Sequence, residues 1–283
     1  MRLEKYNHPV LFYGAAVGFP WICWFIAAWL SRQWDGNPAA MVWGSILGVL
    51  GLCGPAAIAM ILILPDREMK QELFSQIFNF KGIRPIFWIL SFVLFPASIL
   101  SAQAISLLFG YSVSQFKIVE HISFSAGVPS IGLIPAWFLI AIAPILEEFG
   151  WHTYGIHCVR RRFNLLLTCV IFGVIWGVWH MPLGLIKGSY QEVVAEIGVL
   201  HSINFMVSLV PYLIIDNWLY YKTNRNMFLE VLFHFEANFF NEIFLTHPDS
   251  KIIQTVLLLI FSIIVICKEK KFFFDKSHEE LLT

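Results

Sequence analysis

Two adjacent glutamates, Glu147 and Glu148, lie inside the apolar run 131–149, which holds no other charged residue. An ionised carboxylate in hydrocarbon costs roughly 2.5–3.5 kcal/mol on insertion scales, so two neighbouring ones need a compensating role. A carboxylate among apolar side chains can act as a general base. His152 follows Glu148 by four residues and therefore lies on the same helical face. Together these residues indicate a reaction site inside an apolar helix.

Two later apolar runs carry further polar side chains. His180 ends the segment VIWGVWH, and His234 and Asn238 form an i, i+4 pair in LFHFEANFF. An imidazole and an amide on one helical face can donate hydrogen bonds to an oxyanion or orient a water molecule. Alternatively, Glu147, His180 and His234 could hold a divalent metal such as zinc and leave one position open. The sequence leaves a metal-free site and a metal site equally open.

The elements that must hold these residues are apolar helices. Of the 283 residues, 58% are hydrophobic and 13% charged, whereas about 25% are charged in soluble domains. The composition predicts an integral membrane protein and gives no indication of a nucleic-acid partner. Segments of spanning length, about 17–25 residues, lie at roughly 9–30, 41–64, 85–109, 131–158, 164–183, 198–221, 226–245 and 252–267. We expect one all-α polytopic domain, 1–283, with about eight transmembrane helices and a catalytic core at about 131–245.

Basic residues are unevenly distributed over the connections between these segments. If the N-terminus is inside, the outer connections hold Arg32, Lys117, Lys187 and Lys251 of the 19 Lys and Arg residues, and the other fifteen lie on the inner side. Cytoplasmic connections of membrane proteins carry an excess of Lys and Arg. The distribution therefore predicts that both termini are cytoplasmic. We expect substrate to reach the buried site laterally or from the cytoplasmic side, through a cavity that water can enter.

Three motifs around these residues resemble those of the CAAX protease and bacteriocin-processing (CPBP) intramembrane endopeptidases, abortive-infection type. EEFGWHTYGI at 147–156 is similar to the first motif, in which three residues separate two glutamates from an arginine. WGVWH at 176–180 is similar to the second motif, in which three residues separate an aromatic residue from a histidine. HFEAN at 234–238 is similar to the third motif, a histidine and an asparagine four positions apart. Order, spacing and apolar context agree over about 147–238, whereas the first 130 residues resemble nothing specific.

The resemblance implies an intramembrane endopeptidase with a role for each residue of the motifs. Glu147 would activate a water molecule that His180 helps to bind. His234 and Asn238 would stabilise the oxyanion of a tetrahedral intermediate, with Glu148 in support. The substrate would be a small hydrophobic or membrane-tethered peptide.

Two positions depart from the family pattern. His152 stands where the family usually has arginine, and Trp176 stands where phenylalanine is commoner. Both would support the site. Because a histidine titrates near neutrality while an arginine stays charged, the change at His152 predicts weaker activity, pH-dependent activity or a member with another role.

The expected partners are membrane lipid and a hydrophobic or lipid-tethered peptide, and the expected location is multi-pass in the cell membrane, here a bacterial cytoplasmic membrane. One alternative is a non-proteolytic immunity or regulatory membrane protein of the same fold. A second alternative is a proton-coupled transporter. A transporter should show two repeats with broken helices in matching positions, and the sequence shows no such symmetry.

Overall fold

The structure is a computed structural model that describes residues 3–120 and 130–275. Helices coincide with all the predicted spans: α1 (Pro9–Ser31), α2 (Pro38–Ile63), α4 (Pro85–Ser106), α5 (Ala136–Gly150) continued by α6 (Ile156–Arg160), α7 (Leu165–His180), α9 (Val199–Lys222), α10 (Met227–Ile243) and α11 (Pro248–Lys268). Among the described residues, 6 helices are long and apolar enough to cross a membrane, namely α1, α2, α4, α7, α9 and α11. The predicted polytopic helical membrane bundle is therefore confirmed, while α5 and α10 are shorter, at 15 and 17 residues.

Short elements connect these helices. Short helices lie in the connections and beyond the last long helix: α3 (Arg67–Gln76), α8 (Tyr190–Ile197) and α12 (Lys270–Phe274). There are also 3₁₀ turns at Leu3–Lys5, Leu107–Phe109, Val113–Phe116 and Met181–Leu185. The strands β1 (Ser130–Ile131) and β2 (Ile134–Pro135) pair antiparallel, with Ser130 opposite Pro135. The predicted span at 131–158 thus begins too early, because its first residues form this hairpin. Arg2 and Lys276, two of the fifteen inner basic residues, lie outside the described residues.

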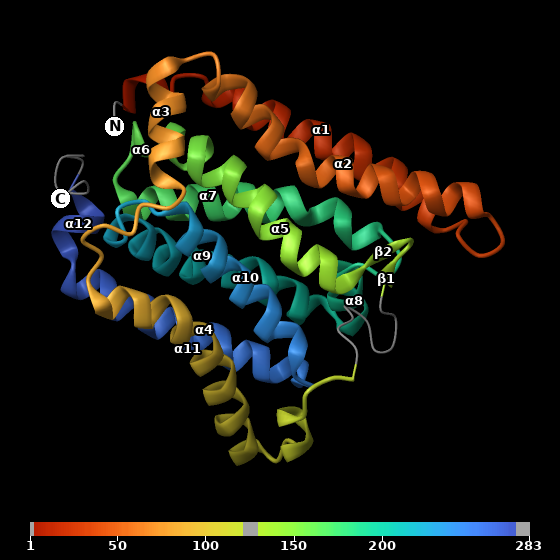
Figure 1. The fold of residues 1–283 in the computed structure, drawn as a ribbon. Coiled ribbons are helices and arrows are strands. Elements are labelled where there is room, and N and C mark those ends of the chain that lie inside the picture. The colour runs from red at the N-terminus through yellow and green to blue at the C-terminus, as the bar shows by residue number, and fades with distance from the viewer. Residues whose placement is uncertain (1–2, 121–129, 276–283) are drawn as a thin grey trace.

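The helices form a closed ring around the middle of the molecule. Following the contacts, α1 packs on α2, α2 on α5, α5 on α10, α10 on α4, α4 on α11, α11 on α9, α9 on α7, and α7 contacts α1. The first and last described residues, Leu3 and Asp275, lie at one end of the bundle with α3, α6 and α12, and the β1–β2 hairpin and α8 lie at the other end (Figure 1). We call these the terminal end and the hairpin end.

Prolines and asparagines define where several helices begin. A proline, which lacks the N–H group that would be left unpaired there, opens four of the long helices: Pro9, Pro38, Pro85 and Pro248. Asn164 caps α7 by accepting from the Leu167 N–H at 2.9 Å. Asn226 caps α10 in the same way, through the Leu229 N–H at 3.0 Å. These caps fix the start of the two helices that carry the histidines of the second and third motifs.

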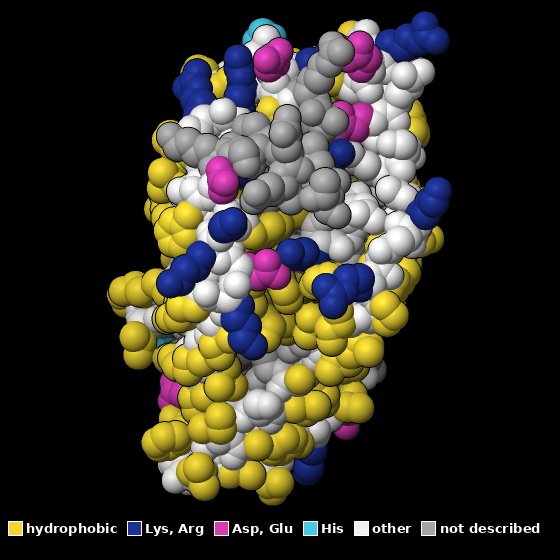
Figure 2. Space-filling view, turned by 90° about the vertical axis from the view of Figure 1, so that its left-hand side faces the viewer, with side chains coloured by type: hydrophobic (Ala, Val, Ile, Leu, Met, Phe, Trp, Pro, Cys, Tyr) yellow, Lys and Arg dark blue, Asp and Glu magenta, His cyan; other side chains and the backbone are white. Residues whose placement is uncertain are grey.

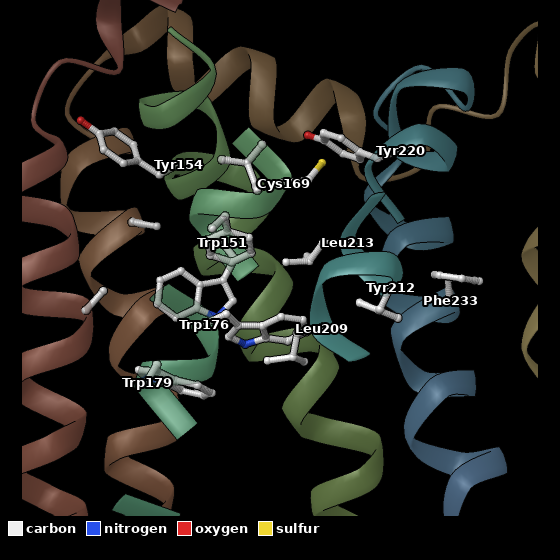
Figure 3. Close-up of a cluster of buried hydrophobic side chains, with 14 of the residues drawn as sticks. Trp151, Tyr154, Cys169, Trp176, Trp179, Leu209, Tyr212, Leu213, Tyr220 and Phe233 are labelled. Atoms are coloured by element: carbon white, nitrogen blue, oxygen red, sulfur yellow. The ribbon is translucent and has the colours of Figure 1, made fainter. Parts of the chain in front are cut away.

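Aromatic side chains fill the space inside the ring. Trp151 packs edge-on to Trp179 with ring centres 5.6 Å apart and lies 5.4 Å from Phe172. Phe172 in turn stacks on Trp176 at 5.9 Å. Figure 3 shows Trp151, Trp176 and Trp179 gathered between α5, α7 and the helices around them. These rings form a rigid wall behind the second motif.

The helix that carries Glu147 and Glu148 is interrupted by a π-helical turn, Trp151–Gly155. π-turns lie mostly inside α-helices and frequently at functional sites. Backbone carbonyl groups around this turn receive hydrogen bonds from hydroxyl groups: Thr153 donates to Phe149 at 2.7 Å and Tyr13 donates to Gly155 at 2.8 Å. In a membrane every backbone polar group needs such a partner. The surrounding helices therefore compensate the irregular turn.

Candidate active site

Glu147 is held by a tryptophan of the neighbouring motif. The carboxylate is 5% exposed on α5, and the indole Nε1 of Trp176 on α7 donates a hydrogen bond to its Oε2 at 2.8 Å. The second carboxylate oxygen, Oε1, receives no bond from the part of the chain that the structure describes. Trp176 thus orients one oxygen of Glu147 and leaves the other available to a water molecule or a substrate.

Glu148 connects two histidines. Its Oε1 accepts from Nδ1 of His234 at 2.5 Å, and its Oε2 contacts Nδ1 of His152 one turn further along the same helix. All three side chains are almost completely buried. The contact between Glu148 and His152 is the one expected from their i, i+4 spacing. Glu148 therefore fixes the ring orientation of His234, which comes from a different helix, α10.

His152 faces two further carboxylates with its other ring nitrogen. Nε2 lies 3.0 Å from Oε1 of Glu230 on α10 and 3.3 Å from Oδ2 of Asp216 on α9. The imidazole is thus surrounded by Glu148, Glu230 and Asp216, three acids from three helices. In the sequence both Glu230 and Asp216 lie in apolar runs, but neither belongs to one of the three motifs. The structure instead shows them in contact with the residue that replaces the family's arginine.

His180 ends α7 and has one nitrogen fixed. Its Nδ1 donates to the backbone carbonyl of Trp176 at 2.7 Å, since a carbonyl oxygen can only accept. The ring packs edge-on against Trp179 at 4.7 Å and Phe205 at 5.4 Å. In the neutral ring Nε2 then carries the lone pair, so this atom can accept a hydrogen bond from water.

One cavity of about 1040 Å³ brings most of these residues together. Glu147, Trp176, His180, His234 and Asn238 all line it. Four of the described residues lie behind the cavity and do not line it: Glu148, His152, Asp216 and Glu230. The site therefore has a layer that faces the cavity, from α5, α7 and α10, and a buried acidic layer behind it. His234 and Asn238, four residues apart on α10, both line the cavity.

Two sets of residues have donor atoms suited to a divalent metal. In the described part of the chain, Glu148, His152 and Glu230 form a group whose ligand atoms all lie within 4.8 Å of one another. This group does not fit a catalytic metal, because both nitrogens of His152 already face carboxylates and none of the three lines the cavity.

The set expected from the sequence, Glu147, His180 and His234, has the donor chemistry of a zinc site. Each histidine is held at Nδ1 by an oxygen acceptor and is left with Nε2 as a ligand atom, which is the usual arrangement around zinc.

Further polar residues line the cavity that the sequence analysis did not single out. Lys251 on α11 lies 3.2 Å from Glu242 and 5.0 Å over the ring of Tyr190. All three line the cavity towards the hairpin end. Tyr190 and Lys251 lie outside the predicted spans, and Glu242 lies close to the end of the span 226–245. None of the three belongs to a motif, so motif spacing did not mark them.

Comparison with known proteins agrees with this geometry. The family described as Type II CAAX prenyl endopeptidase Rce1-like matches residues 129–240. The chain is also 32% identical over 274 residues to CAAX prenyl protease 2 of Methanococcus maripaludis. The aligned region covers 96% of this chain and 97% of that protein. The likeness thus includes the first 130 residues, where no motif had suggested a relative. It favours a protease over an immunity protein or a transporter. The chain therefore belongs to the CPBP family and is a multi-pass intramembrane protease.

Proposed function

We propose that the protein hydrolyses a peptide bond in a small hydrophobic or lipid-tethered peptide, in the cell membrane, with a water molecule activated by Glu147. The observation that supports this most directly is the shared cavity, into which Glu147, His180, His234 and Asn238 all face. The name of the relative, CAAX prenyl protease 2, supports a substrate that carries a lipid.

The proposed reaction begins with a water molecule between Glu147 and His180. Nε2 of His180 accepts one hydrogen bond from this water, because Nδ1 carries the proton that bonds to Trp176. Glu147 takes the second proton as the water oxygen attacks the scissile carbonyl carbon. Trp176 holds Glu147 in place during this step. The result is a tetrahedral intermediate with a negatively charged oxygen.

The remaining residues stabilise the oxyanion, and Glu147 protonates the leaving group. The Asn238 amide and the imidazolium form of His234 donate hydrogen bonds to the oxyanion. Glu148 stabilises that imidazolium, since its carboxylate is bound to Nδ1. The carbon–nitrogen bond breaks when the proton held by Glu147 passes to the leaving nitrogen. A divalent metal held by Glu147, His180 and His234 would polarise the carbonyl and acidify a bound water.

The test is proteolysis by purified protein in detergent. We expect Glu147→Gln, His180→Ala and His234→Ala each to lower kcat by about 10²–10⁴-fold, the usual contribution of a general acid or base. The double variants should be no worse than the singles, because residues that act as one unit are not additive. Glu236→Gln, a buried glutamate on α10 that does not line the cavity, is the matched control.

The substrates are quenched peptides with and without a farnesyl group. Metal content, measured on the same preparations, separates a metal site from a metal-free one. Cleavage by the Glu147→Gln protein at the wild-type rate would refute the proposed mechanism.

A further inference from the structure

Four polar atoms in the acidic layer behind the cavity have no hydrogen bonds. They are Nε2 of His152, Oε1 of Glu230 and both carboxylate oxygens of Asp216, and each is buried without a hydrogen-bond partner in the part of the chain that the structure describes. Elsewhere in the described residues, Glu236 has the one other buried carboxylate oxygen in this state. Buried polar atoms in folded proteins nearly always have a partner. Three unpaired carboxylate oxygens around one imidazole nitrogen therefore need a partner that they can share.

The distances among these atoms suit a shared cation. Nε2 of His152 lies 3.0 Å from Oε1 of Glu230 and 3.3 Å from Oδ2 of Asp216. These separations are short enough for hydrogen bonds, but the directions do not suit them, since none of the three atoms is hydrogen-bonded. Tetrahedral zinc sites have nitrogen and oxygen ligands at about 2.0–2.2 Å, which places two ligand atoms of one ion about 3.3 Å apart. The separation of His152 and Asp216 equals this value, and that of His152 and Glu230 is slightly shorter.

Glu148 prepares His152 to bind a cation. Its Oε2 contacts Nδ1 of His152. Because an ionised carboxylate can only accept, the proton of a neutral imidazole lies on Nδ1 and the lone pair on Nε2. A histidine that is held at one ring nitrogen by a carboxylate and binds the metal through the other is the usual arrangement around zinc. Glu148 is therefore a support of this site and not one of its ligands.

The charges of the acidic layer favour a divalent ion over a single imidazolium. Glu148 contacts two histidines, His152 and His234. By contrast, no lysine or arginine of the described residues forms an ion pair with Asp216 or Glu230, and the basic side chains of the terminal end lie on its surface (Figure 2). An imidazolium at His152 would neutralise one of these two carboxylates, whereas a divalent cation neutralises both. Buried charges without partners are costly, above all in a membrane.

We propose that His152, Asp216 and Glu230 hold a structural divalent metal ion, with zinc as the metal that these ligands suit best. Nε2 of His152, Oε1 of Glu230 and the two oxygens of Asp216 supply four donor atoms, enough for a closed site without a water molecule. The three ligands come from the π-helical turn, from α9 and from α10. The ion thus links three helices behind the active site. It is separate from the catalytic residues, and the proposal does not depend on the proposed reaction.

The proposed site is closed off from the cavity. His152, Asp216 and Glu230 are 1%, 0% and 2% exposed, and none of the three lines the cavity. The ion is therefore taken up while the helices pack together, and it exchanges slowly afterwards. A metal held by Glu147 and His180 would face the cavity instead and would be accessible to a chelator. Resistance to a chelator thus separates the two kinds of site.

The metal content of the purified protein tests the proposal. Cells are grown with added zinc, and the protein is purified in detergent, dialysed against EDTA and analysed for metals by mass spectrometry. We expect about one zinc ion per chain after dialysis, and its release when the protein is unfolded in guanidinium. A wild-type protein that is free of metal after this treatment would overturn the proposal. It would show that Asp216 and Glu230 share a proton instead.

Substitutions assign the metal to its ligands. We expect Asp216→Asn and Glu230→Gln each to lower the metal content at least about tenfold, as changes around metal ligands do to affinity. Three control variants should keep the metal: Glu147→Gln, His180→Ala and Glu236→Gln. The first two alter the cavity, and the third removes the other unpaired buried carboxylate oxygen. Retention of the metal in Asp216→Asn together with its loss from His180→Ala would overturn the proposal.

Two further measurements decide the question if the ligand variants do not fold. His152→Arg brings a permanent charge to the two acids, so we expect a protein with the wild-type unfolding midpoint and at least about tenfold less metal. A His152→Arg protein that keeps its metal would overturn the proposal. X-ray absorption at the zinc edge of the wild-type protein should show nitrogen and oxygen ligands at about 2.0–2.2 Å. Sulfur ligands would assign the metal to cysteines and overturn the proposal as well.

Discussion

Replacing Glu148 by glutamine tests whether the buried acidic layer controls the site in front of it. Glu148 is 1% exposed and does not line the cavity, so it acts only through the side chains that it holds. Its two oxygens bind Nδ1 of His234 at 2.5 Å and Nδ1 of His152. Glutamine has the same shape, but one oxygen becomes an NH₂ group that cannot accept from an imidazole N–H. At least one of the two bonds must then be lost, or one histidine must change tautomer.

The expected loss follows from the strength of one such bond. A hydrogen bond to a charged group contributes about 1.5–3 kcal/mol, which corresponds to a factor of about 10–150 in rate. A wrong tautomer of His234 would cost more, since the equivalent change behind a catalytic histidine lowers kcat by about 10⁴ in serine proteases. We therefore expect Glu148→Gln to lower kcat by at least about tenfold and to leave KM nearly unchanged.

The assay is the quenched-peptide cleavage used above, with kcat and KM measured separately. Size-exclusion profiles and thermal unfolding in detergent show whether the variant is folded. Glu236→Gln is again the control, because it also removes a buried carboxylate from the bundle. If Glu148→Gln keeps the wild-type kcat, or loses no more than Glu236→Gln, Glu148 does not position the site.

Two further changes test the neighbourhood of the site. We expect His152→Arg to retain activity, because a guanidinium has enough N–H donors to bind both Glu148 and Glu230 and keeps a permanent charge. By contrast, His152→Gln should lower the activity at least about tenfold at every pH, since no cation can form between the acids. Equal activity of the two proteins across a pH profile would contradict this expectation. Gly150→Ala should destabilise the bundle by about 1–3 kcal/mol, the cost of overpacking, because the new Cβ would lie 2.5 Å from Cβ of Pro55 on α2. Gly14→Ala is the control, because no atom lies within 4 Å of its new Cβ. The measurement is the midpoint of thermal unfolding. Equal midpoints for Gly150→Ala and Gly14→Ala would argue against close contact of α5 and α2.

The helices could be predicted from the sequence because apolar length is a local property. Each predicted span coincides with a helix, and the errors are at the ends. The largest one is at 131–135, where Gly132, with a φ of 58°, and Pro135 form the hairpin instead of a first helical turn. Glycine and proline are turn residues. The sequence therefore contained a signal for this boundary, which the apolar character of the segment outweighed.

Within one helix the site also followed from spacing. Glu148 and His152 are in contact, and His234 and Asn238 line the same cavity, as their i, i+4 intervals predict. Contacts between helices could not be derived in this way. Asp216 and Glu230 approach His152 only because α9 and α10 pack beside the π-helical turn. The bond from Trp176 to Glu147 likewise depends on how α7 lies against α5.

The π-helical turn Trp151–Gly155 has a consequence for how sequences of relatives compare with this one. A π-turn accommodates one residue more than an α-helical turn, and here it separates the glutamates from Arg160 at the terminal end. A chain with one residue fewer in this stretch can form an unbroken α-helix and keep both ends in place. We therefore expect length differences of a single residue between relatives to fall at 153–155, after the first motif, because the π-helical turn can lose one residue there without moving Glu148 or Arg160.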